Sequence, residues 1–185
     1  MASAAKPLRR IAFLGTGIMG GHMARRLAQA GCDVMAWNRT PARAAGLAAF
    51  GVAVATTPSA AVETADVVVV MLSTGPVADE VLFEPDASGT VPAEAIPPGA
   101  LVVVTSSIPV ATARTQAERL AARGVRYVDA PVSGGERGAR DGTLAIMAGG
   151  AAGDVAAVAE LFTPLGRGSS RCRRQQAGRR RMPCG

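Results

Sequence analysis

Residues 15–20 read Gly15-Thr16-Gly17-Ile18-Met19-Gly20. They follow a short apolar run at residues 10–14 and open a helical pattern at residues 18–30, which is the setting that gives a GxGxxG motif its meaning. The first glycine permits a tight turn, the second lets the backbone approach a pyrophosphate, and the third brings the helix close to the sheet. The N-terminus of the helix then offers free N–H groups to the anion. A glycine-rich turn without a ligand is the alternative.

Valine-rich runs alternate with helical patterns over most of the chain. We expect further strands at residues 34–37, 52–55, 66–72, 101–105, 125–128 and 142–150 and helices at residues 41–50, 110–123 and 154–162, with an irregular connection at residues 83–99. Most runs lack strict alternation, as is typical of strands that helices cover on both faces. The order predicts an α/β fold, a Rossmann-like doubly wound and mostly parallel sheet with helices on both faces.

The second expected strand ends in Asn38, Arg39 and Thr40. A site that prefers NAD usually places a carboxylate there for the ribose 2′-hydroxyl. An amide, a guanidinium and a hydroxyl instead suit a 2′-phosphate. The motif therefore predicts a nicotinamide dinucleotide, NADP in preference to NAD. The alternative is that Arg39 only solvates the loop before Pro41.

A second glycine motif occurs near residue 134. Ser133, Gly134 and Gly135 follow an expected strand, and their consecutive N–H groups and hydroxyl suit a carboxylate. An ordinary turn explains the same residues equally well.

Together the motifs resemble the β-hydroxyacid dehydrogenase family, which includes 3-hydroxyisobutyrate dehydrogenases, tartronate semialdehyde reductases and glyoxylate/succinic semialdehyde reductases. The resemblance covers about residues 9–166 and is most specific at residues 129–150, DAPVSGGERGARDGTLAIMAGG. It implies a Rossmann domain followed by an all-α domain through which family members oligomerise. It also implies reversible hydride transfer between a nicotinamide and a small hydroxy acid or its semialdehyde.

The resemblance implies roles for individual residues. Residues 15–20 would hold the pyrophosphate, and Asn38, Arg39 and Thr40 the adenosine end. Met71 and Leu72 would lie beside the cofactor, and Ser106 near the nicotinamide and substrate. Ser133, Gly134 and Gly135 would hold the substrate carboxylate.

The sequence departs from the family pattern at two places. Val104 stands where the family usually has Asp, two residues before Ser106. The family's catalytic lysine, in a segment that would begin near Gly166, has no counterpart, because the only lysine is Lys6. Arginine cannot replace it as a base, since it stays protonated at ordinary pH.

Other candidate bases have simpler explanations. His22, the only histidine, stands in the first turns of the expected cofactor helix, where a helix-surface position explains it. Asp129 and Asp141 flank the second glycine motif, where capping and turn bonding explain them. We therefore expect this chain to carry no catalytic residue.

Residues 167–185 read RGSSRCRRQQAGRRRMPCG and differ from the rest of the chain. Seven of the 20 basic residues are arginines of this segment, which leaves 13 basic against 14 acidic residues elsewhere. We expect a flexible N-terminus at residues 1–8, a cofactor-binding domain at residues 9–166 and a basic, disordered tail at residues 167–185. Our hypothesis is a frameshift near residue 166 that removed the all-α domain. A functional basic tail is the alternative.

Composition narrows the remaining functions. The tail has no stacking aromatic residue, which argues against a nucleic-acid partner. The longest apolar run, residues 67–72, is too short for a membrane span. Three cysteines without metal-binding spacing favour a reducing cytoplasm and no metal.

Without the all-α domain, we expect apolar surface at residues 155–165 to be exposed. Three functions remain: an NADP-dependent hydroxyacid dehydrogenase, a cofactor-binding module without turnover, and a basic-tailed interaction protein.

Overall fold

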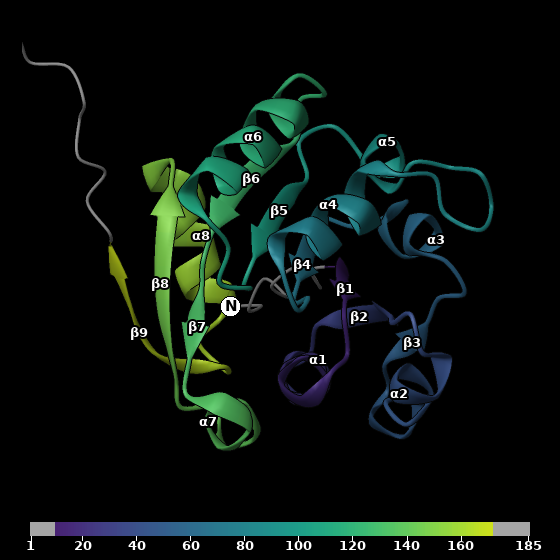
Figure 1. Cartoon of the computed structure of the whole chain (residues 1–185). Helices are drawn as coiled ribbons and strands as arrows, with labels where there is room; N and C mark the ends of the chain where they lie inside the picture. The colour runs from purple at the N-terminus through teal and green to yellow at the C-terminus, as the bar shows by residue number, and fades with distance from the viewer. Residues whose placement is uncertain (1–9, 172–185) are drawn as a thin grey trace, which may run out of the picture.

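The apolar runs form the central strands of one sheet (Figure 1). The computed structural model describes residues 10–171. Its first six strands are β1 (Arg10–Leu14), β2 (Asp33–Trp37), β3 (Ala53–Val54), β4 (Val67–Val70), β5 (Leu101–Val104) and β6 (Arg126–Asp129). They lie in the order β3-β2-β1-β4-β5-β6 and every neighbouring pair is parallel. This is the doubly wound strand order of dinucleotide-binding folds.

An antiparallel extension follows β6. Both β6 and β7 (Val132–Ser133) pair antiparallel with β8 (Leu144–Gly150), and β9 (Gly166–Arg171) pairs with β8 in parallel. The backbone of β9 therefore continues past residue 166, where we expected the domain to end. The remaining residues of the expected tail, and the expected flexible residues 1–8, lie outside the described part of the chain.

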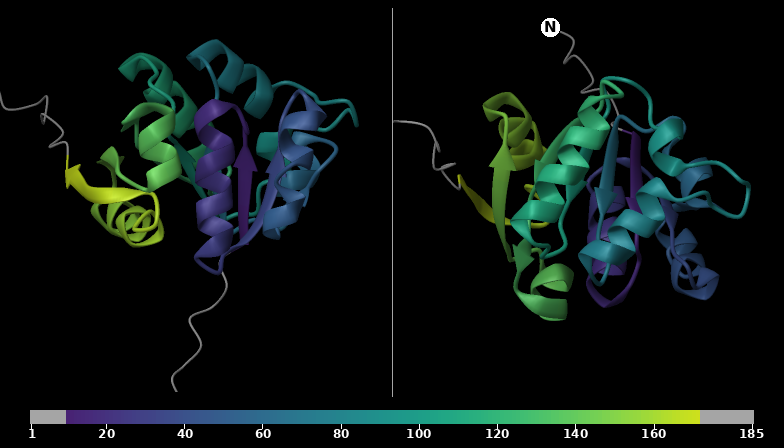
Figure 2. Two further views of the ribbon diagram at one scale, coloured as in Figure 1. Left: turned by 90° about the horizontal axis from the view of Figure 1, so that it is seen from below. Right: turned by 45° about the horizontal axis from the view of Figure 1, so that its top comes forward.

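Helices cover both faces of the sheet (Figure 2). One face carries α1 (Ile18–Gln29), α7 (Gly135–Asp141) and α8 (Ala152–Leu161), and the other carries α3 (Pro58–Val62), α4 (Gly75–Phe83), α5 (Pro92–Ala95) and α6 (Val110–Ala121). The short α2 (Pro41–Ala45) contacts β2 near the sheet edge. The predicted fold class is confirmed.

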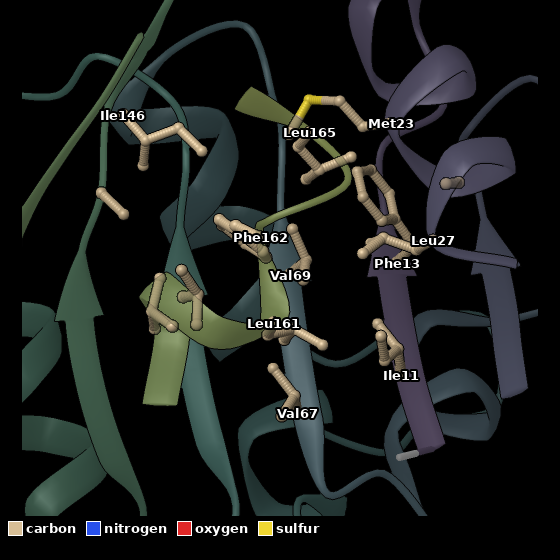
Figure 3. Packing of buried hydrophobic residues seen from close by; sticks show 14 of the residues in the cluster. Ile11, Phe13, Met23, Leu27, Val67, Val69, Ile146, Leu161, Phe162 and Leu165 are labelled. Carbon is tan, nitrogen blue, oxygen red and sulfur yellow. The ribbon is translucent and has the colours of Figure 1, made fainter. Parts of the chain in front are cut away.

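Alternate residues of the central strands point to opposite faces, which divides the core in two. Ile11 and Phe13 of β1 belong to one core cluster with Met23 of α1 and with Phe162, which follows α8 (Figure 3). Leu14 belongs to the core on the opposite face. Both faces of β1 are therefore buried, which explains why its sequence shows no polar alternation.

Glycines account for two of the local differences from the expected elements. The helix expected at residues 41–50 is broken, because α2 ends at Ala45 with Gly46 as its C-cap and only a 3₁₀ turn, Ala48–Phe50, follows. The seven-residue helix α7 was not expected, since it lies between Gly134 and a left-handed Gly142 in a segment that favours turns. The irregular connection expected at residues 83–99 contains the short helix α5.

The expectation of exposed apolar surface at residues 155–165 is wrong. Val158 and Leu165 are 0% exposed and Phe162 is 1% exposed. The reason is that α8 packs on β6 and β8 of this same sheet. The core therefore includes these residues without a further domain.

We predict that Phe162→Ala lowers the free energy of unfolding by about 3–5 kcal/mol, because it empties a closed site. Phe50→Ala is the matched control: Phe50 is 40% exposed and stacks on Arg25, so its loss is expected to be about 1 kcal/mol or less. Urea denaturation measures both. Equal losses would contradict the burial described for Phe162.

Candidate cofactor site

The candidate site lies where the chain changes direction across the sheet. From β1 the chain passes through α1 to β2 on one side, whereas β4, the other neighbour of β1, leads on to β5 on the opposite side. Open α/β sheets bind ligands at the carboxyl ends of the strands at such a switch point. The turn at residues 15–20 begins at this position.

Two glycines of this turn have no room for a side chain. Gly15 has φ +101°, and a Cβ there would clash with the carbonyl oxygen of Met71 and with Leu72. A Cβ on Gly20 would clash with the carbonyl oxygen of Gly15. Glycine is therefore required at both positions, by the tightness of the turn and by the close approach of α1.

Gly17 has the opposite environment. Among the described residues, a Cβ there would find only the Arg43 guanidinium, with Nη1 3.9 Å away. Gly17 is also the N-cap of α1, and no side chain caps it in the described part of the chain. The first N–H groups of α1, which have no partner within the helix, thus face open space with a partial positive charge. This open cradle fits a phosphate group.

Asn38 holds the turn from the side. Its Oδ1 accepts a hydrogen bond from the backbone N–H of Thr16 at 3.0 Å, and its Nδ2 donates to the carbonyl oxygen of Thr40 at 3.1 Å. The Gly15 N–H donates to the Trp37 carbonyl oxygen at 2.9 Å. The amide of Asn38 is therefore used within the protein, where it joins the β1–α1 turn to the end of β2.

Two arginines stand beside this end of the site. Arg39 is exposed, and its Nη2 lies 3.3 Å from Oε2 of Glu80 on α4. Arg43 projects from α2 toward Gly17. The sequence reasoning singled out Arg39 but missed Arg43. The approach of Arg43 to Gly17 depends on how α2 lies against β2, and no pattern in the sequence indicated it.

The ends of β4 and β5 are tied together by hydroxyl groups. Ser106 Oγ accepts from the Leu72 N–H at 2.8 Å, and Thr105 Oγ1 lies 2.9 Å from the Val70 carbonyl oxygen and 3.2 Å from the Met71 sulfur. Ser106 and Thr105 are 3% and 1% exposed. These contacts place Met71, Leu72 and Ser106 together at the switch point. Sequence reasoning missed the part played by Thr105.

The second glycine motif follows β6 at the neighbouring position. The Val132 N–H donates to the Thr105 carbonyl oxygen at 3.3 Å, which ties this segment to the end of β5. Ser133 is exposed, and Gly134 and Gly135 have φ +137° and +61°. The two positive φ angles turn the chain directly into α7.

His22 faces α7. Its Nε2 lies 3.6 Å from Oε1 of Glu136, so it belongs to the contact between α1 and α7. Arg26 strengthens this contact, because its guanidinium donates to the carbonyl oxygens of Pro164 and Arg140 at 2.7 and 3.0 Å. His22 and Arg26 thus link α1 to the segments around it.

The acids that flank the second glycine motif differ in environment. Burial raises the pKa of the Asp129 carboxyl, whose Oδ1 is buried without a hydrogen-bond partner among the described residues. A hydrogen bond from Arg140 lowers the pKa of the exposed Asp141. Thr16 Oγ1 is the other buried side-chain atom without a partner in the described part of the chain.

Within residues 10–171, no group of three or more His, Cys, Asp or Glu residues is arranged to hold a metal ion. None of the helices in that range has the length and apolarity to cross a membrane.

The strand order and the glycine cradle define a dinucleotide-binding domain of the Rossmann type. The chain belongs to the family described as the NAD binding domain of 6-phosphogluconate dehydrogenase, whose model matches residues 10–177. Similar proteins named 3-hydroxyisobutyrate dehydrogenase confirm the family resemblance drawn from the sequence.

Three similar proteins show how far the similarity extends along the chain. The 3-hydroxyisobutyrate dehydrogenase of Pseudomonas aeruginosa is 39% identical over 157 residues, which cover 85% of this chain and 51% of that protein. A solved structure of 3-hydroxyisobutyrate dehydrogenase from Mycobacterium tuberculosis with L-serine is 36% identical, with a TM-score of 0.79, and the match covers 86% of this chain and 52% of that one. The imine reductase from Myxococcus stipitatus in complex with NADP+ is 25% identical, with a TM-score of 0.76, over 89% of this chain and 54% of that one. This chain thus spans about half the length of the relatives it matches.

We predict that Gly20→Ala destabilises the protein by several kcal/mol, because the added Cβ clashes with the Gly15 carbonyl group. Gly21→Ala, one residue further along α1, is the control. A Cβ there meets only the Thr16 carbonyl oxygen at 3.7 Å. It is expected to leave stability unchanged or raise it by up to about 1 kcal/mol. Thermal or urea unfolding measures both, and similar effects of the two changes would rule out the close helix approach.

Proposed function

We propose that this chain binds NADP(H) as the cofactor-binding part of a dehydrogenase that acts on a small hydroxy acid or its semialdehyde. The uncapped N-terminus of α1 above Gly17 carries the proposal. It offers unpaired N–H groups and open space at the switch point, and Gly15 and Gly20 hold it there. A pyrophosphate has the charge and the size for this position.

The remaining roles follow from this placement. In the proposal, residues 15–20 bind the pyrophosphate, and Asn38 keeps the turn and Thr40 in position for the adenosine ribose. Met71, Leu72 and the buried Ser106 lie beside the nicotinamide end, and the Ser106 hydroxyl, which accepts from the Leu72 N–H, keeps a proton to donate. The bound nicotinamide supplies the hydride chemistry, and these residues orient it.

We propose NADP in preference to NAD. The end of β2 carries no carboxylate to bind a ribose 2′-hydroxyl. Arg39 and Arg43 stand on the same side of the turn and offer two guanidinium groups, which bind phosphate by charge-assisted hydrogen bonds.

We propose a small acid as the substrate of the whole enzyme. In the proposal, the exposed Ser133 and the N–H groups of the exposed Gly134 and Gly135 take its carboxylate. The relatives named 3-hydroxyisobutyrate dehydrogenase, one of them with L-serine, support this substrate class. The cysteine usage keeps a reducing cytoplasm as our predicted compartment.

We further propose that this chain alone binds its cofactor without turnover. Oxidation of an alcohol needs a group that accepts its proton near working pH. The only lysine, Lys6, precedes β1, and His22 is directed to Glu136. Asp129 is half-buried. Burial and the nearby charge of Asp129 both raise the pKa of the Tyr127 hydroxyl. A cofactor-binding module is thus the function that fits these residues.

We predict saturable binding of NADPH to the chain, followed by cofactor fluorescence. Gly17→Val fills the open space above α1 and is expected to weaken binding about tenfold or more. Its φ of −67° suits any residue and its neighbourhood is open, so folding is expected to persist. Gly21→Ala is the control and keeps wild-type affinity. Unchanged affinity in Gly17→Val would place the cofactor elsewhere.

We predict no reduction of NADP+ above background with a panel of small 2-hydroxy and 3-hydroxy acids, because no described side chain is set to act as the base. Cofactor binding measured in the same sample shows that the protein is intact. A substrate-dependent rate would overturn the proposal of binding without turnover, whereas the binding proposal would stand.

A further inference from the structure

The Arg39–Glu80 ion pair joins the two sides of the switch point. Arg39 follows β2, and Glu80 lies on α4, which follows β4. Because β1 lies between β2 and β4, the pair spans the width of β1, beside the turn at residues 15–17. Its Nη2–Oε2 distance is 3.3 Å.

Asp79, the acidic residue next to Glu80 on α4, is engaged in a different contact. Asp79 Oδ1 accepts from Nε2 of the fully buried Gln116 at 2.7 Å, and the Tyr127 hydroxyl donates to the Gln116 Oε1 at 2.9 Å. Asp79 therefore belongs to a network that joins α4 to α6 and β6. Glu80 points away from this network, and its side chain is 61% exposed.

Both members of the pair are open to solvent, since the side chain of Arg39 is 62% exposed. An exposed pair of this kind adds little to stability and yields readily to a stronger anion. A phosphate monoester carries more charge than a carboxylate and binds a guanidinium through two hydrogen bonds. Hydroxyl groups at the same place would leave the pair intact.

We infer that Glu80 is a specificity-determining residue that competes with the 2′-phosphate of NADP for Arg39. The inference rests on the proposed function. Binding of NADP separates Arg39 from Glu80, whereas NAD carries no phosphate there and leaves the pair intact. Glu80 thus lowers the ratio of NADP affinity to NAD affinity that Arg39 would otherwise give.

The test is the ratio of the dissociation constants for NAD+ and NADP+, measured by calorimetry on the full chain at low ionic strength. Glu80→Gln is expected to tighten NADP+ binding about two- to fivefold, the range that an exposed charge pair supports, and to leave NAD+ binding unchanged. Glu118→Gln makes the same change in net charge on α6, which packs on β6, and is expected to leave the ratio unchanged. Equal unfolding temperatures of the two variants show that stability is not the cause.

The same change in an Arg39→Gln background shows whether Glu80 acts through Arg39. The inference predicts that Glu80→Gln then has no effect on the ratio. If Glu80→Gln still changes the ratio in the Arg39→Gln background, or if Glu118→Gln changes it equally, then Glu80 acts only by general charge repulsion and the inference is overturned. If the wild-type chain binds NADP+ and Glu80→Gln leaves the ratio of the two dissociation constants unchanged, this inference alone is overturned. If the wild-type chain binds neither dinucleotide, the proposed function is overturned as well.

Discussion

The turn between β1 and α1 depends on two backbone contacts that exclude any side chain. Gly15 lies against the Met71 carbonyl group at the end of β4, and Gly20 lies against the Gly15 carbonyl group. The two contacts place the start of α1 directly above the switch point of the sheet. The unpaired N–H groups of the helix then face the open space at Gly17.

Side chains fix the surrounding loops to this turn and leave few groups for a ligand. Asn38 holds the turn to the end of β2, and Ser106 and Thr105 hold the end of β5 to β4. These polar groups are engaged within the protein, so the loops are ordered before a ligand arrives. Recognition is thereby left to backbone N–H groups and to exposed cations such as Arg39 and Arg43.

Features that depend on local backbone geometry followed from the sequence, and those that depend on distant partners did not. The glycine motif and the buried valine runs predicted the parallel sheet and the position of the turn, since each acts within one βαβ unit. The burial of Phe162 was missed because it depends on the packing of α8 on β6 and β8 and on a core shared with β1, which no local pattern shows. The Arg39–Glu80 pair and the Thr105–Met71 contact likewise join segments whose proximity only the strand order determines.

An NMR titration of the ¹⁵N-labelled chain with NADPH tests the proposed cofactor position most directly. If the pyrophosphate binds at the N-terminus of α1, the amide signals of Gly17, Ile18 and Met19 will shift most and will saturate together. The amide of Ala28, near the other end of the same helix, will shift little. Absent shifts at Gly17–Met19, or larger shifts on the opposite edge of the sheet, would contradict a dinucleotide site at this turn.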